Sequence, residues 1–114
     1  MEKRRVVITG IGAVTPLGNT APESWQAVKD GVCGIGPITR YDTSNMKVKL
    51  AGEVKNLDAE GILGKRDCKK MDRFTQLALV AAEEAMKDSG LEPEKLYDIL
   101  NTEFFDNWFF LLYS

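Results

Sequence analysis

The side chains that most often carry out chemistry in proteins are sparse in this sequence. Its 114 residues include no histidine and two cysteines, Cys33 and Cys68. Histidine is the usual general base near neutral pH, so this chain cannot assemble a Cys–His or Ser–His nucleophile by itself. The two cysteines form no C-x-x-C pair, which favours reduced intracellular thiols over a metal site or a disulfide framework. We therefore predict no catalytic residue and no metal ligand in this chain.

A run of cations at residues 65–70 is the only concentrated basic patch in the sequence. Four of its six residues are basic, namely Lys65, Arg66, Lys69 and Lys70. From the residue types alone, a solvated surface segment is the favoured interpretation. The net charge of the whole chain is −2, which gives no general attraction to nucleic acid or to anionic membranes.

Glycines follow a short apolar segment near the amino terminus, in the stretch RRVVITGIGAVTPLG at residues 4–18. The β-branched residues 6–8 predict a buried strand, because a strand with one wet face would alternate. A dinucleotide fingerprint needs Gly or Ala three residues after its second glycine, where this chain has Thr15. The segment is also too short and interrupted for a signal peptide. We therefore predict a central strand that leaves the core through a crowded turn, without a cofactor site.

The first predicted helix spans residues 21–30. Thr20 and Glu23 have the spacing of a capping box at its start. Helical spacing places three apolar side chains on one face, which we expect to pack in the core: Trp25, Val28 and Val32.

One long helix is the strongest pattern in the rest of the chain. Residues 73–88 are strong helix formers with Asp72 at the N-cap position, and apolar residues cover most of the circumference, which predicts burial. Shorter elements are predicted before it: an extended piece at 35–39, a half-exposed strand at 47–54 and a short helix at 57–63.

The last residues differ in composition from the rest. The chain is 44% hydrophobic and 28% charged, as expected for one small globular domain, yet residues 101–114 hold six of its ten aromatics. They show no regular period and are too few for a membrane-spanning helix, which needs about 20 apolar residues. Residues 91–100 favour another short helix. We expect an aromatic tail produced by truncation or a frameshift, which divides the chain into a portion at 1–91 and a tail at 92–114.

Motifs over nearly ninety residues resemble the opening of the β-ketoacyl-[acyl-carrier-protein] synthases, and most closely the elongating synthase II type. The pattern VxITGxGxVTPLGN comes first and a Trp-bearing helix follows. The later motifs are Gly34-Ile35, Tyr41-Asp42-Thr43-Ser44, Ala51-Gly52, Lys70-Met71-Asp72 and Asp88-Ser89-Gly90-Leu91. A likeness in register over this length is more specific than any single short motif.

The resemblance implies an α/β chain that forms the incomplete N-terminal part of a layered, thiolase-like fold. It implies decarboxylative condensation of malonyl-carrier with acyl-carrier thioesters in fatty acid elongation, by a cytoplasmic homodimer without metal or organic cofactor. The family's Cys nucleophile and two His lie beyond the matched region, so neither Cys33 nor Cys68 takes that role. The alternative hypothesis is a non-catalytic fragment that binds acyl carrier protein or a synthase subunit.

The resemblance also implies a binding partner for the basic run at residues 65–70. In the family, basic residues just before a Lys-Met-Asp motif help to hold the acidic helix of acyl carrier protein. Arg66, Lys69 and Lys70 occupy those positions and are the candidate docking residues. The neighbours of the strand at 6–8 come from later sequence in the family, so we expect unpaired edges and marginal stability in this chain alone.

Overall fold

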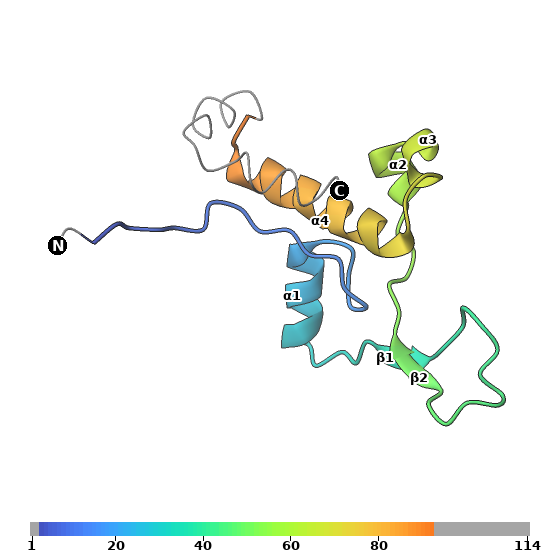
Figure 1. Ribbon diagram of the computed structural model, residues 1–114. Helices are drawn as coiled ribbons and strands as arrows, with labels where there is room; N and C mark the ends of the chain where they lie inside the picture. The colour runs from blue at the N-terminus through green and yellow to red at the C-terminus, as the bar shows by residue number, and fades with distance from the viewer. Residues whose placement is uncertain (1–2, 93–114) are drawn as a thin grey trace.

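The computed structural model describes residues 3–92, where short elements surround one long helix (Figure 1). In chain order these elements are α1 (Ala21–Lys29), β1 (Ile35–Pro37), β2 (Leu50–Gly52), α2 (Ala59–Leu63), α3 (Lys65–Cys68) and α4 (Arg73–Ser89). The helix predicted at 91–100 lies almost entirely outside the described residues, and the aromatic tail at 101–114 lies wholly outside them.

The N-terminal segment lies along α4 in an extended form (Figure 1). A side-chain carbon placed on Gly12 would lie 2.7 Å from the Ala85 nitrogen, and one placed on Gly10 would lie 2.7 Å from the Ser89 nitrogen. Both distances are far shorter than van der Waals contact, so only glycine permits this approach of one backbone to another. The glycines after the apolar segment therefore form a contact surface for α4.

Carboxylates of α4 fasten the same segment by accepting hydrogen bonds from backbone amides. The Ala13 N–H donates to Glu84 Oε2 at 2.8 Å, and the Ala21 N–H donates to Glu84 Oε1 at 2.9 Å. One turn further along α4, Asp88 Oδ2 accepts from the Ile11 N–H at 2.9 Å. Because Ala21 is the first residue of α1, Glu84 ties the N-terminal segment and α1 to α4.

The buried strand predicted at residues 6–8 is wrong. Val6 is 92% exposed and Ile8 is 83% exposed. A strand needs neighbouring backbone for its amide and carbonyl groups, and the strands found within residues 3–92, β1 and β2, pair with each other. The apolar pattern marks a segment suited to a sheet, but the described part of the chain supplies no partner for it.

Helix α1 begins where the capping pattern predicts, with one difference in the cap. Thr20 Oγ1 accepts from the Glu23 N–H at 3.3 Å, as a capping box requires. The Glu23 carboxylate, however, accepts from the Asn19 N–H at 2.9 Å, one residue earlier than the box predicts. Both hydrogen bonds satisfy amides at the helix start, so the local signal still fixes the first turn.

The face of α1 predicted to lie in the core is exposed. Trp25 is 62% exposed, and Val28 and Val32 are exposed as well. The helix is held at its beginning, where Ser24 is buried and its Oγ lies 2.8 Å from Thr15 Oγ1. Periodicity identifies the apolar face of a helix, but burial also needs an element that covers it.

The core within the described residues is small and lies where α2, α3 and α4 meet. Its buried apolar members are Ala59, Cys68 and Val80, with Val14, Leu57 and Leu63 packed against them. Helix α4 is less buried than its apolar circumference predicts, since Phe74 is 72% exposed. Asp72 stands at the predicted N-cap position but its side chain makes no capping hydrogen bond, and Gly90 ends the helix in the left-handed conformation.

Strands β1 and β2 form an antiparallel pair in which Gly36 lies opposite Ala51. The extended segments predicted at 35–39 and 47–54 are present but shorter. Beside the pair, the Glu53 carboxylate accepts from the Thr39 hydroxyl at 2.8 Å and from the Thr39 N–H at 3.1 Å. These two hydrogen bonds stabilise the charged form and hold the pKa of Glu53 below its usual value.

Substituting Gly12→Ala should destabilise the chain, because the new methyl group would overlap the α4 backbone at Ala81 and Ala85. Overpacking of this kind costs about 1–3 kcal/mol in the free energy of unfolding, measured by urea titration. Gly36→Ala is the matched control, since a side-chain carbon there meets nothing within 4 Å. Equal effects of the two substitutions would contradict the close approach to α4.

Removing the charge of Glu84 should also lower stability. In Glu84→Gln one of the two amide donors would face a side-chain NH2 group in place of an oxygen, so about 1–3 kcal/mol of unfolding free energy should be lost. The adjacent control, Glu83→Gln, removes an exposed i,i+4 pair with Lys87 and should cost about 0.5 kcal/mol or less. A Glu84 variant no less stable than the Glu83 variant would show that these hydrogen bonds do not hold the segment.

Candidate functional site

Three exposed cations, which we call the basic surface, lie on α3 and in the turn after it. This basic surface consists of Arg66, Lys69 and Lys70, and each side chain is exposed. The ion pair found within residues 3–92 joins Lys87 to Glu83, so no cation of the basic surface forms an ion pair there. Three cations without an ion-pair partner in this part of the chain are available to an anionic ligand or an acidic protein.

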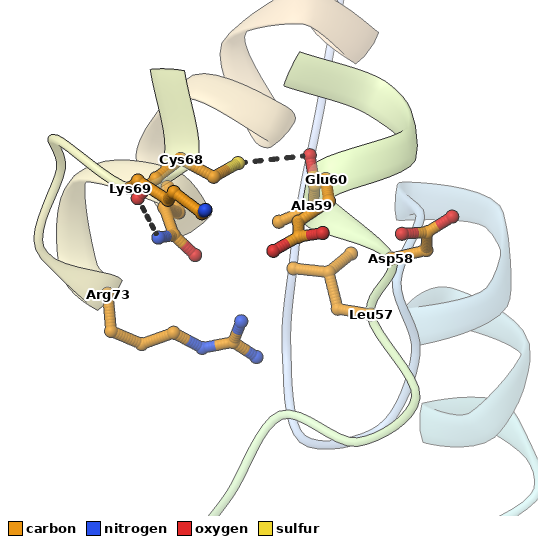
Figure 2. A pocket seen from close by; sticks show the side chains of 8 residues that line it. Leu57, Asp58, Ala59, Glu60, Cys68, Lys69 and Arg73 are labelled. Carbon is orange, nitrogen blue, oxygen red and sulfur yellow. Dashed lines mark hydrogen bonds between the residues drawn. The ribbon is translucent and has the colours of Figure 1, made fainter. Parts of the chain in front are cut away.

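The basic surface rests on a hydrogen-bonded support. Cys68 is buried, and its thiol donates to the Ala59 carbonyl of α2 with 3.3 Å between sulfur and oxygen. From α4, Gln76 Nε2 donates to the Cys68 carbonyl at 2.9 Å and to the Met71 carbonyl at 3.2 Å. Figure 2 shows the contact of the Cys68 thiol with the Ala59 carbonyl as a dashed line. Helix α3 is therefore fixed to both neighbouring helices, which positions the backbone that carries the cations.

A cavity of about 270 Å³ lies beside the basic surface, lined by residues of α2, α3 and α4 and of the segments that precede α2 and α4. Lys69 lines it and also belongs to the basic surface. Figure 2 shows the Arg73 side chain extending from the start of α4 into this space, towards Leu57 and Ala59. The Arg73 Nε atom is buried and has no hydrogen-bond partner among the described residues.

Other candidates for chemistry are dispersed. Both cysteines are free thiols, Cys33 exposed in the segment before β1 and Cys68 buried on α3. Within residues 3–92 no three side chains of the metal-binding types gather closely enough to hold an ion. The same part of the chain contains no helix long and apolar enough to cross a bilayer.

The sequence identified the exposed members of this site and missed its buried ones. Charge density and the family resemblance together selected Arg66, Lys69 and Lys70. The structure exposes each of them on α3 or in the turn after it, and their docking role stays a prediction. Cys68 as an anchor and Arg73 as a cavity residue were not predicted. The one available signal was spacing, because Arg73 and Gln76 lie three residues apart and therefore share a face of α4.

The two thiols should react at very different rates with a thiol reagent such as DTNB. Cys33 is exposed and should be modified rapidly. Cys68 is buried and contacts Ala59, so its modification should be slow and should require local opening of the structure. In Cys33→Ser the fast phase should disappear and the slow phase should remain. Rapid modification of both thiols in the native chain would contradict the buried support.

Comparison with known proteins finds close relatives. The chain matches the family described as "Beta-ketoacyl synthase, N-terminal domain" over residues 3–104. It is 47% identical over 91 residues to 3-oxoacyl-[acyl-carrier-protein] synthase 2 of Synechocystis sp., and 50% identical over 91 residues to the protein of that name from Staphylococcus aureus. Each alignment covers 80% of this chain and 22% of the relative, so the chain spans about a fifth of the length of these relatives.

A solved structure shares the arrangement of the described elements. It is the ishigamide ketosynthase/chain length factor, with a TM-score of 0.74 and 32% sequence identity, covering 82% of this chain and 23% of that one. The predicted fold class, part of a thiolase-like α/β architecture, is confirmed by this neighbour. The resemblance predicted over nearly ninety residues is likewise confirmed by the 91-residue alignments.

Proposed function

Because this chain belongs to the β-ketoacyl synthase family, we propose that it is the amino-terminal part of a 3-oxoacyl-[acyl-carrier-protein] synthase 2. Such an enzyme condenses malonyl-carrier with acyl-carrier thioesters, with decarboxylation, in fatty acid elongation. This chain has no histidine, and neither cysteine stands in the family's nucleophile motif. In this proposal the chain supplies scaffold and a docking surface, and residues elsewhere in the parent enzyme perform the condensation.

The docking role is supported chiefly by the basic surface. The three cations are exposed and have no ion-pair partner within residues 3–92. Hydrogen bonds of Cys68 with Ala59 and of Gln76 with Cys68 fix the helix that carries or directly precedes them. Exposed cations of this kind speed the encounter with an acidic partner and orient it, and contribute less to the final affinity. A mobile carrier protein that delivers its thioester and leaves again suits such a surface.

The local charge, and not that of the whole chain, is what favours an acidic protein partner. With a net charge of −2, the chain as a whole weakly repels other acidic proteins. Attraction must therefore come from the basic surface within one screening length, about 10 Å at 0.1 M salt. This locality predicts both the site of docking and its sensitivity to salt.

A second candidate function is that of a non-catalytic fragment that binds acyl carrier protein or a synthase subunit. It is favoured by the absence of histidine and by the exposed apolar residues 6–8, which offer backbone groups to a sheet of another chain. The two candidates differ in whether the chain carries out condensation as part of a longer protein. Both use the same basic surface.

Three further features belong to this proposal through the family resemblance. They are a cytoplasmic location, a homodimeric parent enzyme, and a chain divided into a synthase portion at 1–91 and a divergent tail at 92–114. A reducing compartment is consistent with the two free thiols, Cys33 and Cys68.

Reversing two charges of the basic surface tests the docking role. The double variant Arg66→Glu with Lys69→Glu should bind acyl carrier protein about tenfold more weakly or worse, a loss of about 1.4 kcal/mol, because attraction becomes repulsion. Binding is measured by isothermal titration calorimetry at 0.1 M and 1 M salt, where the screening length falls from about 10 Å to about 3 Å.

The charge-matched control reverses two exposed lysines between the strands, in Lys47→Glu with Lys49→Glu. It has the same net charge as the double variant and should retain most of the affinity. If both double variants lose the same affinity, net charge alone explains the effect. If neither charge reversal nor salt changes the affinity, docking at this surface is refuted.

A further inference from the structure

The apolar segment at residues 6–8 is exposed and its backbone has no partner. Val6, Val7 and Ile8 are all exposed, and none of residues 3–9 makes a hydrogen bond to another described residue. The blue N-terminal end of the chain extends away from the helices (Figure 1). An unpaired strand edge with β-branched side chains is a template for pairing with another strand.

The contacts just after this segment define which of its edges is open. The amides of Ile11 and Ala13, two residues apart, both donate to carboxylates of α4. In an extended backbone alternate amides point the same way, so the amides of Ile8 and Gly10 point to the opposite edge. Helix α4 therefore occupies one edge of the N-terminal segment and leaves the other edge free for a second strand.

The charges on either side of the segment favour a second copy of this chain as that strand. Three cations at residues 3–5 precede it, and none of them forms an ion pair within residues 3–92. The carboxyl end of α4 follows it, where Gly10 lies against Ser89 and Asp88 is exposed. The dipole of a helix attracts cations to its carboxyl end. Within one copy, however, about 20 Å of extended backbone separate Arg4 from Gly10.

We propose that two copies of this chain join through residues 6–8 in an antiparallel strand pair, with Val7 opposite Val7 on the two-fold axis. This register places Val6 opposite Ile8, and Arg4 opposite Gly10 of the second copy. The cations of each copy then reach the carboxyl end of α4 in the other copy. A parallel pair would set the cations side by side, which is unfavourable.

The pairing goes beyond the proposed docking function and does not rest on it. It is a property of the chain of 114 residues, because the family resemblance places other neighbours of this strand in later sequence. Strands of this length bury much less surface than a permanent dimer needs. The dimer should therefore be reversible and should depend on protein concentration.

Sedimentation equilibrium of the full chain at increasing concentration measures the pairing, and a monomer–dimer equilibrium is expected. Val7→Lys should weaken dimerisation about tenfold or more, because two like charges would face each other across the axis. Val48→Lys is the matched control, since Val48 is 69% exposed and Val7 is 65% exposed. The control should dimerise like the unmodified chain.

Charge reversal distinguishes the antiparallel pair from a parallel one. Lys3→Glu with Arg4→Glu should weaken dimerisation about fivefold, because anions would then meet Asp88 and the carboxyl end of α4. Lys47→Glu with Lys49→Glu has the same net charge and should leave dimerisation nearly unchanged. Stronger dimerisation of the first double variant would contradict the antiparallel pair, since it is the result expected for cations that lie side by side.

Disulfide formation tests the register in a Cys33→Ser background, where the remaining thiol, Cys68, is buried. Val7→Cys should form a covalent dimer on mild oxidation, because Cα atoms of facing residues lie about 4.5–5.5 Å apart, within disulfide range. Ile8→Cys should form little, because Ile8 and its copy would be diagonal neighbours about 7–8 Å apart.

Each outcome supports the strand pair or overturns it. A monomer at every concentration, growth beyond the dimer, or equal effects of Val7→Lys and Val48→Lys would refute pairing through this segment. Cross-linking of Ile8→Cys as fast as that of Val7→Cys would refute the register. The substituted residues are exposed, so the variants should fold, which circular dichroism checks. No carrier protein is present in these experiments, so their failure would leave the proposed docking function standing.

Discussion

The Glu84 carboxylate is the contact on which the arrangement of this chain depends. Its two oxygens accept from the amides of Ala13 and Ala21, so one side chain of α4 holds both the N-terminal segment and the start of α1. Gly10 and Gly12 permit the close approach that makes these hydrogen bonds possible. The Ala13 amide has no strand beside it within the described residues, and the Ala21 amide is one that a helix start leaves unpaired. One side chain of α4 satisfies both.

The same helix serves the candidate site at its opposite end. Near its start, α4 contributes Gln76, which fixes α3, and Arg73, which enters the cavity beside the basic surface. The contacts that fix the N-terminal segment and those that fix α3 are therefore made by different turns of one helix. Variants of Glu84 should act on stability, whereas charge reversal at Arg66 and Lys69 should act on the proposed docking, because these cations are exposed and far from the Glu84 hydrogen bonds along the chain.

Local signals in the sequence predicted local structure well. The Thr20 cap and helical periodicity predicted α1 at Ala21–Lys29, and periodicity predicted α4 at Arg73–Ser89, each within one residue. The predictions of a strand at 6–8 and of a buried Trp25 are wrong, because both depend on elements that the described chain does not place beside them. Charge density predicted the exposed cations, while the buried contact of Cys68 and the unpaired Arg73 Nε depend on packing that no spacing rule encodes.

Our central proposal is that acyl carrier protein docks on α3 and the turn after it, and chemical-shift mapping tests this proposal most directly. Unlabelled carrier protein would be titrated into the isotopically labelled chain. The account predicts amide shifts concentrated at residues 60–76, with the paired strands β1 and β2 and the exposed segment at residues 6–8 unchanged. Shifts centred on Trp25 and residues 6–8, or no shifts at all, would contradict it.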